Sequence, residues 1–141
     1  ARVKAFSMPA LEPGAIVDYQ YVTEDTKPLI EGGFWTGWFF GGVEPRMLSR
    51  LTVTAPKDMV IRETVKNAQI TPGAKNRLDR VVQTLPGDMV RTVYTMQNIE
   101  PLAVEPFMPS PISYLPQVHL SSLKDWQDVA TTYWNLAKDR M

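Results

Sequence analysis

The sequence predicts a mainly β domain, a β-sandwich that ends in one C-terminal α-helix. Three observations predict it. Apolar and polar residues alternate along several short runs, as they do in strands with one buried face. Twelve prolines in 141 residues separate these runs, as turn residues do in all-β proteins. Only the last 20 or so residues change to the 3.6-residue period of an amphipathic helix.

Seven segments have the composition of strands. In chain order they are residues 3–6, 15–23, 34–40, 47–55, 59–66, 78–84 and 89–98. Segment 34–40 is apolar on both faces, so we expect it in the middle of a sheet or against a second layer. The last two segments form the clearest hairpin, joined by Leu85-Pro86-Gly87-Asp88. Five prolines between residues 99 and 116 then predict an extended surface segment.

A helix is predicted from Leu123 to Lys138. Ser122 precedes the helical pattern and Asp125 follows three residues later, which resembles a capping box. The apolar residues recur on one stripe: Trp126, Val129, Ala130, Tyr133, Leu136 and Ala137. Trp126 heads the stripe, so we expect it to be the buried anchor of the helix.

Composition excludes several classes of function. Fifteen basic and 15 acidic residues cancel and the pI is about 6.8, which argues against nucleic-acid binding. With no cysteine and one histidine, thiolate catalysis, disulfides, iron–sulfur ligation and multi-histidine metal sites are excluded. No apolar run reaches the roughly 18–20 residues of a membrane span. We therefore expect no metal, no cofactor and no membrane insertion.

His119 is the one side chain with an ordinary pKa near neutrality, so it is a candidate general base. Serines lie nearby, but the chain has no G-x-S-x-G nucleophile elbow. The pattern favours a polar residue that leads into the capped helix, and we assign no catalytic residue.

Two other groups have weaker claims. Glu100 and Glu105 could act as a carboxylate pair, but five extended residues separate their backbones by about 17 Å, so we favour a structural role. Trp35 and Trp38 could form a sugar-stacking platform. Positions i and i+3 face opposite sides of a strand, however, so we expect them to pack in the core.

Three segments, in this order, resemble the C-terminal part of a bacterial domain-of-unknown-function family. They are residues 6–21, with Pro13-Gly14 and Tyr19-Gln20-Tyr21, residues 98–109, and residues 121–126. That family typically precedes a transglutaminase-like domain. The resemblance implies immunoglobulin-like layering of the sandwich, no catalytic residues in this domain, and a periplasmic or extracellular location. It also implies that strands normally lie upstream of residue 3.

These inferences give two units, a β-sandwich over residues 1–120 that lacks its first strands, and a helix over residues 121–141 that leads to a following domain. We expect a non-catalytic accessory domain that positions a downstream transglutaminase- or protease-like domain, or assists its substrate recognition. The alternative is a free-standing carbohydrate- or peptide-binding module, and an independent enzyme is disfavoured. We expect the downstream domain as partner, and pairing with a second copy through an open sheet edge.

Overall fold

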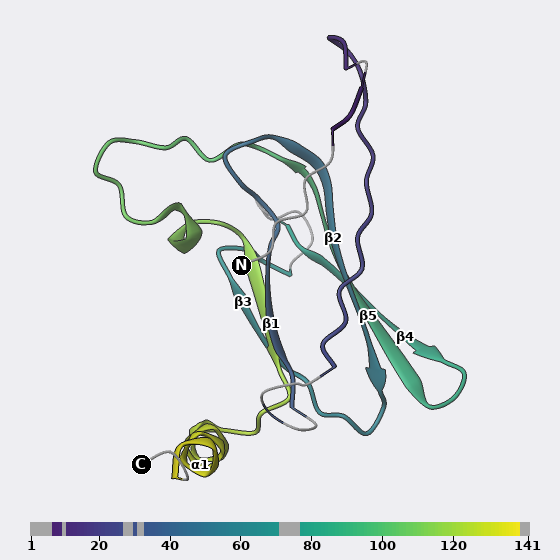
Figure 1. Ribbon diagram of the computed structural model, residues 1–141, viewed down its shortest axis with the longest axis vertical. Helices are drawn as coiled ribbons and strands as arrows, with labels where there is room; N and C mark the ends of the chain where they lie inside the picture. The colour runs from purple at the N-terminus through teal and green to yellow at the C-terminus, as the bar shows by residue number, and fades with distance from the viewer. Residues whose placement is uncertain (1–6, 10, 27–29, 31–32, 71–76, 139–141) are drawn as a thin grey trace.

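Two three-stranded antiparallel sheets and one C-terminal helix make up the protein in a computed structural model that describes residues 7–9, 11–26, 30, 33–70 and 77–138 (Figure 1). The elements in chain order are β1 (Trp35–Phe39), β2 (Arg46–Pro56), β3 (Arg62–Lys66), β4 (Asp79–Leu85), β5 (Met89–Ile99), the 3₁₀ turn η1 (Pro111–Ser113), β6 (Gln117–Ser121) and α1 (Trp126–Ala137). The mainly β prediction with a C-terminal helix is confirmed.

Sheet B, in the order β2-β5-β4, contains the predicted hairpin. Strands β4 and β5 pair up to Leu85 opposite Met89, and Gly87 and Asp88 between them both have a positive φ. Glycine adopts this conformation without strain, and aspartate tolerates it better than most residues. Strand β2 pairs along the other side of β5.

Sheet A, in the order β1-β6-β3, has a centre that the sequence patterns do not predict. Strand β6 is formed by five residues that were expected to lead into the helix, and it pairs antiparallel with both neighbours. At its end, the Ser122 hydroxyl accepts a hydrogen bond from the Phe34 backbone N–H at 2.9 Å. Segment 34–40 was expected in mid-sheet or against a second layer. Strand β1 lies at an edge of the described sheet, and the segment lies against the other sheet through Trp38 and Phe40.

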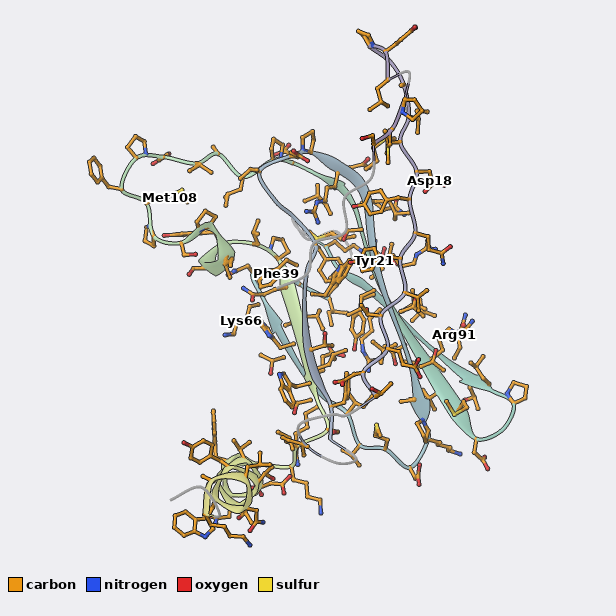
Figure 2. All side chains as sticks on the ribbon, viewed as in Figure 1. Asp18, Tyr21, Phe39, Lys66, Arg91 and Met108 are labelled. Atoms are coloured by element: carbon orange, nitrogen blue, oxygen red, sulfur yellow. The ribbon has the colours of Figure 1, made fainter. Side chains whose placement is uncertain are left out.

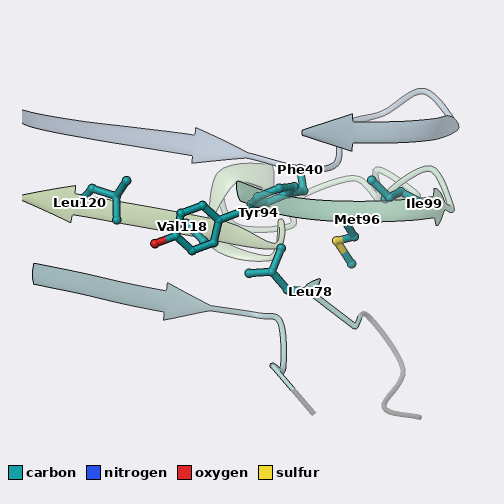
Figure 3. Packing of buried hydrophobic residues seen from close by; sticks show 7 residues of the cluster. All are labelled: Phe40, Leu78, Tyr94, Met96, Ile99, Val118 and Leu120. Atoms are coloured by element: carbon teal, nitrogen blue, oxygen red, sulfur yellow. The ribbon is translucent and has the colours of Figure 1, made fainter. Parts of the chain in front are cut away.

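The core lies between the central strands of the two sheets, β5 and β6 (Figure 3). Strand β5 contributes Tyr94, Met96 and Ile99, and β6 contributes Val118 and Leu120. Phe40, just after β1, and Leu78, just before β4, complete the cluster. Trp38 adds a polar tie between the sheets, because its indole Nε1 donates to the Ser49 hydroxyl of β2 at 3.2 Å.

Two expected strands have different outcomes. Residues 3–6 lie outside the described residues. Residues 15–23 are described but form no strand there, although their apolar residues alternate as predicted. The predicted apolar face consists of Val17, Tyr19 and Tyr21, which are 45%, 68% and 77% exposed. In the described part of the chain, no other element therefore covers these apolar side chains.

The helix begins later than predicted and is anchored differently. Its N-cap is Asp125, whose carboxylate accepts from the Asp128 backbone N–H at 2.8 Å, so Ser122 is not the cap. The expectation that Trp126 is a buried anchor is wrong, because its side chain is 85% exposed. None of the residues of α1 is buried, and the helix lies beyond the ends of the strands (Figure 1).

Candidate functional site

The outward face of sheet A collects the side chains with the most varied chemistry. Because Val118 and Leu120 of β6 point into the core, the intervening residues point the other way. The strand register places three rows across this face: Trp35–Ser121–Arg62, Gly37–His119–Thr64 and Phe39–Gln117–Lys66. Aromatic residues thus lie on β1, polar residues on β6, and two cations flank a threonine on β3.

His119 is held at the centre of this face. Its Nε2 lies 2.6 Å from the Gln117 side-chain oxygen. The Gln117 amide nitrogen donates to the Ile112 and Leu115 carbonyls, so the oxygen is the acceptor and His119 Nε2 carries the proton. In a neutral ring, Nδ1 is then a hydrogen-bond acceptor. Phe39 packs edge-on against the ring with centroids 6.2 Å apart.

The lack of a side chain at Gly37 leaves the ring uncovered. A Cβ at this position would lie 3.1 Å from Nδ1 and 3.2 Å from Cε1 of His119. Any other residue would therefore crowd the imidazole. The general-base reading of His119 has no further support here, because its ring partner is an amide rather than a carboxylate.

A groove of about 510 Å³ extends from this face to the start of the helix. Its strand residues are Arg62, Thr64, Lys66, His119 and Ser121, and its other residues are Leu123, Lys124, Asp125, Trp126 and Val129. The predictions named His119 and Trp126 but not the three cations. The sequence signal for the two cations on β3 is the alternation in Arg62-Glu63-Thr64-Val65-Lys66. This signal is weak, because the segment is short and Val65 is its one apolar residue.

A second polar cluster lies between the sheets. Glu63 of β3 accepts hydrogen bonds from the Tyr94 hydroxyl at 2.5 Å and from Arg80 Nε at 2.9 Å. Burial raises the pKa of Tyr94 to about 12, and the hydrogen bond to Glu63 adds to the rise. The three groups satisfy one another across the two sheets, so their arrangement is that of a structural tie.

The remaining candidates are not brought together. Glu100 lines a separate hollow of about 330 Å³ beside Tyr114, and Glu105 is not among the residues that line it. Trp35 and Trp38 do face opposite sides, as predicted. Trp38 faces the other sheet but is 39% exposed, and Trp35 is 55% exposed, so the expectation that both pack in the core is wrong.

Among the described residues, no helix is both long and apolar enough to cross a bilayer. The same residues contain no group of three or more histidine, cysteine, aspartate or glutamate side chains arranged to hold a metal ion.

Comparison with known proteins gives a family and a fold. The family model described as a Domain of Unknown Function with solved structure (DUF3857) matches residues 1–103. A solved structure described as a putative protease from Parabacteroides distasonis is similar with a TM-score of 0.57 and 13% identity. The match covers 71% of this chain and 18% of that one, so the similarity shows the fold alone. The comparison with curated proteins found no match.

Proposed function

The chain belongs to the DUF3857 family of domains of unknown function, and on that premise we propose that it is a non-catalytic accessory domain of a larger bacterial protein. In this proposal it precedes a transglutaminase- or protease-like domain in an exported or envelope protein. It positions that domain or assists its substrate recognition.

The observation that carries the proposal is the uncovered apolar surface of α1. Tyr133, Trp134 and Leu136 are 72%, 58% and 41% exposed. A 12-residue helix gains most of its stability from packing of its apolar face. An apolar helix surface left open to solvent is therefore suited to contact with a neighbouring domain.

The structural comparison supports a multidomain context. The similar region occupies about a fifth of a chain described as a putative protease, so in that protein the fold is one part among several. The lone His119, held by an amide, and the absence of cysteine support an accessory role rather than a catalytic one.

We also propose that the two sheets are layered as an immunoglobulin-like sandwich. The support is the shared core of β5 and β6 together with two polar ties, Trp38 to Ser49 and Tyr94 to Glu63. Each tie joins one strand of sheet A to one strand of sheet B, which is what facing layers allow.

Hydrogen exchange tests the accessory role. Amides of residues 126–137 should exchange quickly in the 141-residue chain and slowly in the protein encoded by its complete reading frame. A Tyr133→Ser/Trp134→Ser variant should remove this added protection, and the control variant Tyr19→Ser should retain it. A reading frame with no following domain, or equal exchange in both proteins, contradicts the proposal.

A further inference from the structure

We propose that the groove between the outward face of sheet A and the start of α1 binds an acidic saccharide, a short oligosaccharide whose rings carry carboxylates. The proposal goes beyond the accessory role, because it depends on the groove residues and not on a following domain.

Positive charge is concentrated in this groove although the whole chain is neutral. Arg62, Lys66 and Lys124 line it, and Asp125 is the one acidic residue among the lining residues. In the described part of the chain, none of these three cations forms an ion pair, since the pairs there are Arg77–Asp79 and Arg80–Glu63. A ligand carboxylate would therefore meet cations that are not already neutralised.

One side of the groove is apolar and largely open. Trp126 lines it with 85% of its surface exposed, beside Val129 and Leu123. An uncovered indole offers a flat face with its π-electrons outward, which suits the C–H face of a sugar ring. The exposure that contradicts an anchoring role for Trp126 is thus what a stacking role requires.

Side chains of the sheet face supply both hydrogen-bond donors and acceptors. The His119 ring, with Nε2 committed to Gln117, presents Nδ1 as an acceptor beside Gly37. The Thr64 and Ser121 hydroxyls, which also line the groove, can donate or accept. Sugar hydroxyls need this mixture of partners. The volume of about 510 Å³ lies within the usual range for small-ligand sites.

The strand pairing favours a saccharide over a peptide. An extended peptide gains affinity chiefly through main-chain hydrogen bonds to a free strand edge. Residues of β6 and β3 line the groove, and β6 already pairs with β1 on one side and β3 on the other. The lining residues of β3, which are Arg62, Thr64 and Lys66, share the outward face with His119 and Ser121, so they meet a ligand from the face of the sheet and not from its free edge. The groove therefore offers polar side chains, which match a ring of hydroxyls better than a peptide backbone.

Titration calorimetry with trigalacturonate tests the proposal in the full 141-residue chain. The matched probe is the methyl ester of the same trisaccharide, which keeps the rings and removes the charge. We expect the ester to bind at least about tenfold more weakly, because it loses charge-assisted hydrogen bonds, which are about twice as strong as neutral ones. Binding should also quench tryptophan fluorescence, and the quenching should be lost in Trp126→Ala.

Charge-removing variants locate the site. Arg62→Gln and Lys66→Gln should each weaken trigalacturonate binding several-fold, with unchanged thermal midpoints. Arg91→Gln is the matched control, because Arg91 is an exposed cation on the β4–β5 hairpin, well away from Lys66 (Figure 2). Hexaglutamate serves as the peptide probe.

Three results would overturn the inference. The first is no binding of trigalacturonate, and the second is equal affinity for its ester. The third is binding of hexaglutamate without binding of the saccharide, which would make the groove a peptide site. None of these results bears on the exchange test of α1, so the two proposals can fail separately.

Discussion

The Tyr94 hydroxyl on β5 donates a hydrogen bond to the Glu63 carboxylate on β3, so one side-chain contact joins the two sheets. Arg80 of β4 reaches the same carboxylate oxygen. The phenol ring of Tyr94 meanwhile belongs to the apolar core. One residue thus serves both the packing of the sheets and the polar tie between them.

Removal of that hydroxyl should destabilise the fold. Tyr94→Phe keeps the ring but leaves the partly buried Glu63 carboxylate with one donor fewer, which should cost about 1–2 kcal/mol in the free energy of unfolding. Urea denaturation measures it. Tyr133→Phe is the control, because Tyr133 is 72% exposed and its hydroxyl should contribute almost nothing. Equal stabilities of the two variants would contradict the tie.

The raised pKa of Tyr94 predicts a specific alkaline transition. The folded protein retains the phenol proton up to about pH 12, whereas the unfolded chain loses it near the ordinary value of 10.0. Between those pH values the folded state binds more protons, so this contribution is fully present below pH 10 and falls as pH rises toward 12. Denaturation at a series of pH values should show the decline, and Tyr94→Phe should flatten it.

Truncation of Phe40 should lower the stability of the fold strongly, whereas truncation of Trp126 should hardly change it. Phe40 is completely buried and Trp126 is 85% exposed. Phe40→Ala should cost about 3–5 kcal/mol, whereas Trp126→Ala should leave the thermal midpoint of the 141-residue chain nearly unchanged. Differential scanning calorimetry compares them. A large loss from Trp126→Ala would show that the helix is docked through this residue after all.

Gly37 and His119 should be energetically coupled. Gly37→Ala places a methyl group against an imidazole held by Gln117 and Phe39, and we expect a loss of about 1 kcal/mol. In a His119→Ala background the same change should stabilise the strand by about 0.5–1 kcal/mol, because alanine restricts the unfolded chain. A double-mutant cycle from urea denaturation measures the coupling. Additive effects would exclude the contact.

The open strand edges predict self-association. In the described part of the chain, β1, β3, β2 and β4 each have one edge without a partner strand, and unpaired edges are templates for strand addition. Two-fold pairing is the commonest way to close them. Light scattering should show the mass rising toward a dimer as concentration increases. A monomeric mass throughout, with normal exchange protection in every strand, would contradict this.

The sequence predicted local features of the fold well. The β4–β5 hairpin was predictable because its turn residues and both alternating strands are contiguous in the chain. Strand β2 was predictable because its inward residues, including Leu51 and Val53, alternate with polar ones over most of its 11 residues.

Features that depend on distant partners were not predictable. Strand β6 has two inward apolar residues, Val118 and Leu120, and follows Pro116, so five residues gave too little pattern. This segment forms a strand because it pairs with two strands that lie more than 50 residues away in the sequence. For the site, the pattern identified His119 but not its assembly with Arg62 and Lys66, which exists only in the register of sheet A. Periodicity also predicted an apolar stripe on α1 without indicating what would cover it.

The position of β6 has a consequence for synthesis of the protein. All three strands of sheet B lie between residues 46 and 99, so this sheet can assemble while the chain is still being extended. Sheet A forms later, because among the described strands β6 is the one that joins β1 to β3, and β6 follows both of them in the chain. During that interval Phe40 and Tyr94 lack their packing partners on β6. Before β6 is synthesised, the nascent chain thus exposes the apolar face of sheet B. This is the face that a chaperone would bind.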